Sequence, residues 1–186
     1  MAKLICFGNA SLNGYINDDR GKFDFSEPDE EVHQFVNDTL RNVGTHLYGR
    51  RNYETMMAWE TDPDLANISP ITRDFAQIWA GADKVVYSTT LPAVQTKKTS
   101  LERNFDAEAV RKMLASSPRD MLIAGPTLAA HAFRAGLVDE VHVMLVPIIV
   151  PAGTRFLPDD VRLELQLISE RRFTNGTVYL RYRAKR

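Results

Sequence analysis

The sequence contains one cysteine, Cys6, and this scarcity limits the kinds of site that the chain can build. A single cysteine cannot form an internal disulfide framework or a cysteine-rich zinc site. The four histidines are scattered without the spacing of metal ligands, so we expect no bound metal. No Gly-x-Gly-x-x-Gly segment occurs, and no phosphate-binding loop with its lysine, which disfavours a Rossmann dinucleotide fold.

An excess of charge of one sign is also lacking. The chain has 23 lysines and arginines against 24 aspartates and glutamates, a net charge of -1, which predicts no nucleic-acid or anionic-membrane partner. The N-terminal apolar run is too short for a signal peptide and no stretch resembles a membrane span, so we expect a cytoplasmic protein. A length of 186 residues fits one domain, 1–186.

The most informative stretch begins at residue 121. Residues 121–124 form an apolar run that predicts a buried strand, and residues 127–135 have the apolar spacing of a helix that Gly136 ends. Residues 141–150 form a second apolar strand. Because both strands are too apolar for an edge, we expect them to be parallel and central in a sheet.

The turn Ala124-Gly125-Pro126-Thr127 lies between that first strand and its helix. Ligands of parallel sheets bind beyond the carboxyl ends of the strands, where a small-residue turn meets a helix N-terminus. This turn is therefore a candidate phosphate site, and a packing turn without a ligand is the alternative.

Other segments have regular patterns of their own. Further strands are expected at 4–7, 45–48 and 85–87, and helices at 70–81 and 106–114. The helix with the clearest apolar stripe is expected over Ser26–Val43, with Ser26 as its cap and Gly44 as its end. Near the C-terminus, alternating residues at 161–167 and 178–182 flank an Asn-Gly turn, which predicts an antiparallel hairpin.

Three polar groups outside that turn are candidates for a site. Gly49-Arg50-Arg51 opens a helix, which favours an anion, although a solvated basic cap is the alternative. Ser88-Thr89-Thr90 follows a strand, so its hydroxyls bind phosphate or ribose, or only complete a turn. Glu31 lies on the flank of the apolar stripe and is a candidate site residue. The alternative is a solvated carboxylate in the first turn that interacts favourably with the helix dipole.

Taken in order, these motifs resemble the dihydrofolate reductase superfamily, and within it the branch that contains the reductase domain of the riboflavin-biosynthesis protein RibD. The resemblance extends over almost the entire chain and is carried by residues 10–14, 47–54, 86–91, 125–129, 136–140 and 175–176. Asn13 stands where that branch usually has an aspartate, and Ala124 where it usually has the first of two glycines.

The resemblance implies an α/β fold, a dihydrofolate reductase-like three-layer α/β/α sandwich whose mostly parallel mixed sheet ends in a C-terminal antiparallel hairpin. It implies an NADPH-dependent reductase acting on a small-molecule nitrogen heterocycle, imine or carbonyl, with room for a homodimer. An aminouracil phosphate of riboflavin synthesis is the substrate that the family favours. A non-catalytic nucleotide-binding or oligomer-forming protein that keeps the fold is the alternative.

The same resemblance assigns roles to individual residues. It implies Glu31 as the residue of the proton path and Phe35 as a wall of the substrate pocket. The residues that it implies for the coenzyme are Asn9, Ala10, Ile16, Gly49, Arg50, Arg51, Ser88, Thr89, Ala124, Gly125, Pro126, Thr127 and Thr154.

Overall fold

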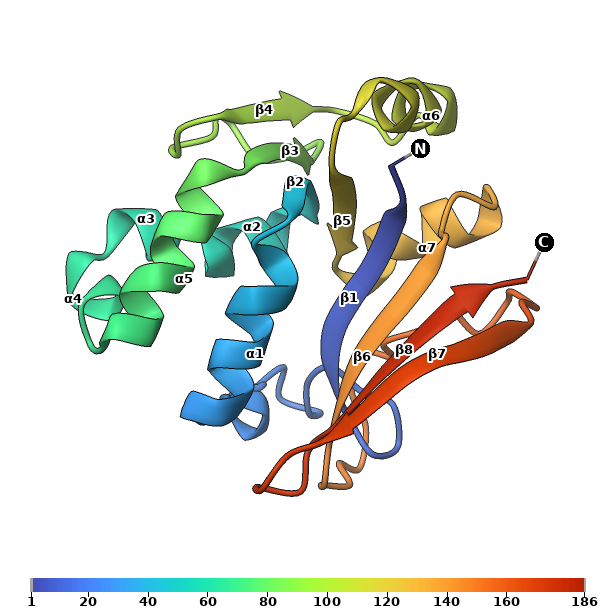
Figure 1. Ribbon diagram of the computed structural model, residues 1–186. Coiled ribbons are helices and arrows are strands. Elements are labelled where there is room, and N and C mark those ends of the chain that lie inside the picture. Colours follow the sequence, from blue (N-terminus) through green and yellow to red (C-terminus); the bar gives the residue numbers. More distant parts are fainter. Residues whose placement is uncertain (1, 186) are drawn as a thin grey trace.

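The computed structural model describes residues 2–185, and these form an eight-stranded sheet with helices on both faces (Figure 1). The strand order is β4-β3-β2-β5-β1-β6-β8-β7. Neighbouring strands are parallel from β4 through β6, and only the β6–β8 and β8–β7 pairs are antiparallel. The strands are β1 (Leu4–Ser11), β2 (Val43–Gly49), β3 (Asp83–Tyr87), β4 (Thr99–Glu102), β5 (Asp120–Ala124), β6 (Glu140–Val146), β7 (Leu165–Arg172) and β8 (Val178–Ala184). The mostly parallel sheet with its C-terminal hairpin confirms the predicted fold class.

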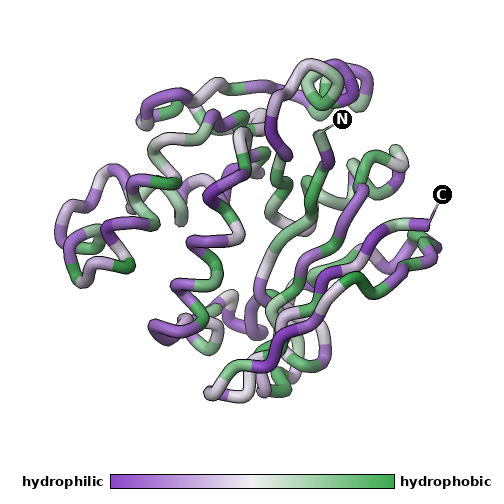
Figure 2. Tube along the Cα trace, in the orientation of Figure 1, coloured by the Kyte–Doolittle hydropathy of each residue, from purple (hydrophilic) through white to green (hydrophobic). Residues whose placement is uncertain are grey.

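Alternation along the strands divides the hydrophobic core between the two faces. In β5, Met121 and Ile123 pack with residues of α6 and α7, whereas Leu122 packs with residues of α1 and α5 on the other face. Figure 2 shows hydrophobic residues along the central strands and hydrophilic residues on the outer turns of the helices. The helices are η1 (Asp24–Ser26), α1 (Glu30–Leu40), α2 (Arg50–Met56), α3 (Ala58–Thr61), α4 (Pro63–Ala66), α5 (Pro70–Gly81), α6 (Ala107–Ser116) and α7 (Pro126–Arg134). None of the helices in this described part is long and apolar enough to cross a membrane.

The strand–helix–strand unit predicted after residue 120 is present as β5, α7 and β6. Both strands pair in parallel with β1, one on each side, so they are central as expected. The second strand is shorter than predicted, because it ends at Val146 instead of residue 150. Pro147 follows, and a proline cannot donate the next hydrogen bond of a ladder.

The helix predicted over Ser26–Val43 is wrong at both ends. It begins at Glu30, and Asp29 caps it by accepting a hydrogen bond from the Val32 N–H at 2.9 Å. Pro28 explains the late start, since a proline disfavours helical geometry in the residue before it. At the other end, Val43 and Gly44 belong to β2, where Val43 pairs with Asp120.

The hairpin is also shifted along the chain. Its first strand was expected over 161–167 but covers Leu165–Arg172. Leu165 lies opposite Ala184, the last residue of β8, so residues before it have no partner strand to pair with. The β8 strand, with the Asn175-Gly176 turn before it, is close to its predicted place.

Candidate functional site

The predicted coenzyme residues are assembled at one edge of the sheet, the carboxyl ends of the parallel strands. Gly49 at the end of β2 pairs with Tyr87 at the end of β3, and Tyr48 pairs with Ala124 at the end of β5. The turns that follow these three strands therefore lie side by side. This arrangement is the one in which parallel sheets bind ligands.

Arg50 connects two of these turns. Its Nη1 donates to the Thr90 Oγ1 at 2.9 Å, and its Nε donates to Glu54 at 2.7 Å. The Ser88 hydroxyl accepts hydrogen bonds from the backbone N–H groups of Thr90 at 3.2 Å and Leu91 at 2.9 Å, so it already completes the turn. The exposed side chains of Arg51 and Thr89 are the more accessible groups on this part of the edge.

Gly125 forms the turn between β5 and α7, at the N-terminus of a nine-residue helix. Its φ is +97°, a left-handed conformation that favours glycine. A Cβ placed there would meet the Asn52 Cβ at 3.7 Å, which is ordinary van der Waals contact without overlap. No side chain caps the helix at Gly125, which leaves the helix N-terminus available to an anion.

A cavity of about 250 Å³ lies beside the start of α7. It brings together Pro126, Thr127 and Thr154, three residues that the sequence analysis assigned to the coenzyme from separate segments. The residues that line it are Pro126, Thr127, Ala130, Arg134, Thr154, Arg155, Leu157, Pro158 and Asp159.

The loop after β1 is tied to the segment that carries Thr154. The Ile16 N–H donates to the Thr154 carbonyl at 2.9 Å, and the Thr154 N–H donates to the Asn17 side chain at 2.7 Å. The Asn13 Nδ2 donates a hydrogen bond to the Val150 carbonyl at 2.8 Å, and its Oδ1 accepts one from the Val150 N–H at 3.2 Å. The Asn13 amide thus ties the loop after β1 to Val150 by two bonds, of which an aspartate could form only the one that accepts from the Val150 N–H, because a carboxylate has no N–H to donate.

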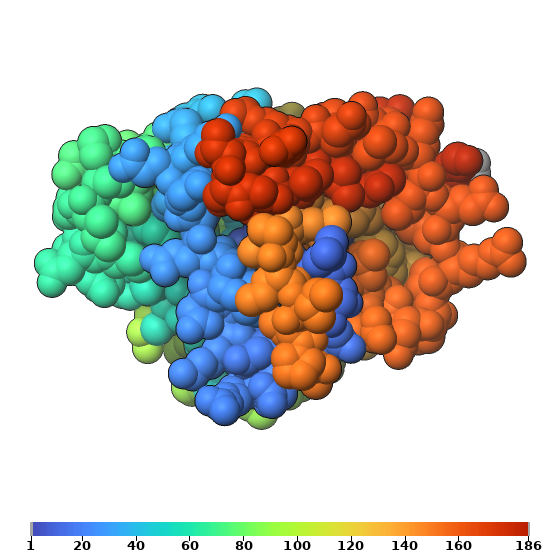
Figure 3. Space-filling model, turned by 90° about the horizontal axis from the view of Figure 1, so that it is seen from below, coloured from blue at the N-terminus to red at the C-terminus, as the bar shows by residue number. Residues whose placement is uncertain are grey.

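A second cavity, of about 130 Å³, opens where the N-terminal loop, the end of β6 and the hairpin turn meet (Figure 3). Asn9, predicted to contact the nicotinamide, lies in its wall. Ala10 is 1% exposed and packs in the core, so only its backbone can reach a ligand. This cavity is called here the substrate cavity, because the resemblance predicts the substrate pocket beside Phe35 of the neighbouring helix. The residues that line it are Asn9, Phe25, Ser26, Glu27, Pro28, Val32, Met144, Val146, Pro147, Asn175 and Thr177.

Glu31 lies beside the substrate cavity but is absent from its described wall. Its carboxylate accepts hydrogen bonds from the Thr174 N–H at 3.0 Å and hydroxyl at 2.7 Å, and from Arg171 at 3.3 Å. These bonds, that of the Thr174 N–H foremost, lower the pKa of Glu31. Glu31 therefore ties α1 to the hairpin, and its expected part in proton transfer stays a prediction.

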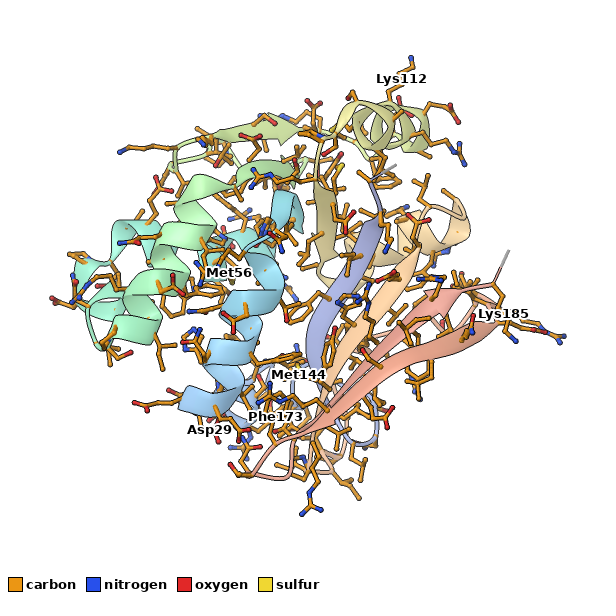
Figure 4. All side chains as sticks on the ribbon, in the orientation of Figure 1. Asp29, Met56, Lys112, Met144, Phe173 and Lys185 are labelled. Atoms are coloured by element: carbon orange, nitrogen blue, oxygen red, sulfur yellow. The ribbon has the colours of Figure 1, made fainter. Side chains whose placement is uncertain are left out.

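Phe35 is likewise part of the packing behind the cavity. Its ring meets Phe173 edge to face at 5.3 Å and Tyr179 at 4.7 Å, and the Arg171 guanidinium lies 5.1 Å from its centre. Figure 4 shows Phe173 and Met144 near the start of α1, where Asp29 caps the helix. Phe35 thus supports Met144 and its neighbours, which form the wall itself.

Sequence reasoning missed three groups in the substrate cavity. Val32 was recognised only as part of the apolar stripe of the predicted helix, and Asn175 only as part of a turn. Thr177 was assigned no role, because it lies between that turn and the strand predicted from residue 178. Glu27 was placed inside a helix, although Pro28 directly after it is a signal for an extended residue. Contact between the hairpin turn and α1 has no local signal, because the two segments are far apart in sequence.

A buried polar network lies on the same sheet face as the substrate cavity. Glu140 is 0% exposed and accepts hydrogen bonds from Lys3 and Arg181 at 2.8 Å each, while His142 lies 3.0 Å away and in turn meets the Tyr179 hydroxyl at 3.0 Å. Burial alone would raise the pKa of Glu140, but hydrogen bonds from Arg181, Lys3 and His142 outweigh it and lower this pKa to about 2. The network joins Lys3, directly before β1, to β6 and β8, and Glu140 and His142 precede Met144 of the cavity wall on β6.

Comparison with known structures identifies the fold. Over 100% of both chains the fold matches a putative riboflavin biosynthesis protein from Shewanella sp. PV-4, at 22% identity and a TM-score of 0.77. Dihydrofolate reductase from Enterococcus faecalis, complexed with NADP(H), matches at 12% identity and a TM-score of 0.65, over 99% of this chain and 97% of that one. The fold is therefore dihydrofolate reductase-like.

The family follows from the sequence. The model of the RibD C-terminal domain matches residues 2–179, so the chain belongs to the RibD C-terminal domain family, which is reductase-like. A deaminase/5-amino-6-(5-phosphoribosylamino)uracil reductase from Thermotoga maritima matches at 14% identity and a TM-score of 0.66, over 99% of this chain but 57% of that chain. A search of the curated proteins gave no match.

Proposed function

We propose that this chain is an NADPH-dependent reductase that acts on a nitrogen heterocycle or a related imine or carbonyl compound. The observation that carries the proposal is the Gly125 turn at the uncapped start of α7, which adjoins one cavity and lies on the same sheet edge as the other. Membership of a reductase-like family supports the reaction type. NADPH, when bound, would supply the hydride.

The residues at this edge fit the parts of such a coenzyme. The Gly125 turn, with Ala124, Pro126 and Thr127, would hold the pyrophosphate through the positive end of α7. Arg50 and Arg51, with Ser88 and Thr89, would hold the phosphate of the adenosine half by charge-assisted hydrogen bonds. The residues that would face the nicotinamide half are Asn9, Ala10 through its backbone, Ile16 and Thr154.

Reduction of a ring nitrogen also requires a proton. We assign the proton path to Glu31, acting through water, with Phe35 supporting the substrate wall. The segment 13–17, bonded to Val150 and Thr154, excludes water from one side of the site. A single domain over 1–186, a cytoplasmic location and a homodimer are further proposals, and sedimentation analysis tests the last of them.

The decisive experiment has two parts. Titration with NADPH tests coenzyme binding, and a screen of pteridines and aminopyrimidines for loss of reduced-coenzyme absorbance tests reduction. Binding followed by oxidation of NADPH with one of these compounds is the expected result. Binding without turnover of any compound would favour a non-catalytic nucleotide-binding protein that keeps the fold.

A further inference from the structure

The two cavities differ in the charge of their walls. The cavity beside α7 has two arginines, Arg134 and Arg155, and one aspartate, Asp159. The substrate cavity has a single ionisable residue in its wall, Glu27, and its other polar groups are amides and hydroxyls. Arg134 is paired with Asp160 at 2.8 Å, so Arg155 is the cation that the first wall offers to a phosphate. The second wall offers only the Glu27 carboxylate, which repels a phosphate.

The Glu27 carboxylate is available to a ligand. Asp29, not Glu27, caps α1, and within the described part of the chain the Glu27 side chain has no hydrogen bond or ion pair. Its backbone N–H bonds the Asp24 carbonyl at 3.1 Å, which places the residue at the end of η1. The contrast is Glu31, whose carboxylate is occupied by Thr174 and Arg171.

The arginine of the neighbouring hairpin is not free to balance an anion in this cavity. Arg171 donates to Glu31 at 3.3 Å, and its guanidinium lies 4.9 Å from the ring centre of Phe173 and 5.1 Å from that of Phe35. Glu27 is exposed, so a phosphate bound beside it would keep much of its water but would meet a like charge. This repulsion, partly screened by solvent, weakens phosphate binding.

The size of the substrate cavity agrees with this charge pattern. At about 130 Å³ it is smaller than the cavity beside α7, at about 250 Å³, and it offers room for a ring system. Asn9, Asn175 and Thr177 offer donors and acceptors to the edge of such a ring.

Resting on the proposed function, we infer that the substrate of this chain is an uncharged or cationic nitrogen heterocycle without a phosphate, and that Glu27 selects against the phosphorylated form. The chain thus differs in substrate class from the phosphoribosylaminouracil reductase that it resembles in fold.

A matched pair of ligands tests this inference. Calorimetry in the presence of NADP⁺ measures the affinities of 5-amino-6-(ribosylamino)uracil and of its 5′-phosphate. We expect the unphosphorylated compound to bind about tenfold more tightly, a difference of about 1.4 kcal/mol. Glu27→Gln should bring the ratio of affinities close to one, and Glu27→Lys should reverse it. Glu30→Gln, the same change three residues away on the exposed start of α1, should leave the ratio unchanged.

The possible failures are distinguishable. Equal or tighter binding of the phosphate by the wild type, a ratio that Glu27→Gln does not change, or no binding of either compound would overturn the inference. Absence of NADPH binding by the wild type, or no oxidation of NADPH with this pair or with any compound of the screen above, would overturn the proposed reductase function instead.

Discussion

Substitution of Gly125 offers a strong test of the coenzyme site, because its effect on the stability of the fold and its effect on coenzyme affinity can be estimated separately. Its φ of +97° is costly for any other residue, and valine there should destabilise the fold by about 1–3 kcal/mol. The nearest atom to a new Cβ is 3.7 Å away, so steric overlap adds little. At roughly 2–4 °C per kcal/mol for a chain of this size, the melting temperature of Gly125→Val should fall by about 2–12 °C.

Coenzyme affinity should fall far more than this modest loss of stability suggests. A side chain on Gly125 would keep a phosphate away from the N–H groups of α7, and each charge-assisted hydrogen bond is worth about 1.5–3 kcal/mol. Loss of two such bonds would weaken NADPH by roughly 100-fold or more. Thermal unfolding without ligand and an NADPH titration measure the two effects separately.

Gly136 provides the control at the opposite end of α7. It also has a positive φ, +63°, and a Cβ there would have no neighbour within 4 Å. Gly136→Val should therefore lower the melting temperature to a similar extent while leaving NADPH affinity unchanged. If Gly125→Val unfolds cooperatively and still binds NADPH like the wild type, the turn is a packing feature and the assignment is refuted.

Three other residues give further tests. Arg50→Ala should weaken NADPH by about 10- to 100-fold through the loss of a charge-assisted partner, and NADH much less; equal losses in parallel titrations would count against the phosphate assignment. The proposal that Glu31 supplies a proton predicts that Glu31→Gln lowers turnover by about 10²–10⁴-fold at neutral pH, less so at lower pH, with NADPH affinity almost unchanged. Near-normal turnover, with chemistry shown to be rate-limiting, would leave Glu31 only as a tie to the hairpin. Because folding lowers the pKa of Glu140 from 4.5 to about 2, its charge should stabilise the fold by on the order of 3 kcal/mol above pH 4.5, and this contribution should disappear as the pH falls towards 2. Urea unfolding of the wild type and Glu140→Gln should therefore differ most at pH 7, differ by about half as much at pH 3 and converge only near pH 2, whereas a constant difference would contradict the linkage.

The sequence alone was sufficient for the elements whose signals are local. The apolar run 121–124, the Gly125-Pro126 stop and the periodic helix after it predict β5 and α7 closely, because burial and backbone preference act within a few residues. The Asn175-Gly176 turn identifies the hairpin for the same reason. Ends of elements were less certain: a single proline moved the start of α1 from Ser26 to Glu30.

Only the tertiary structure decided which of two neighbouring carboxylates faces the substrate cavity. Glu31 was the candidate from its helix position and from family resemblance, yet Thr174 and Arg171, more than 130 residues away in sequence, bind its carboxylate. Glu27, which local reasoning assigned to a helix, lies in the wall of the cavity instead. Hydrogen-bond partners and cavity walls depend on where distant strands place their turns, and a pattern of neighbouring residues does not contain that information.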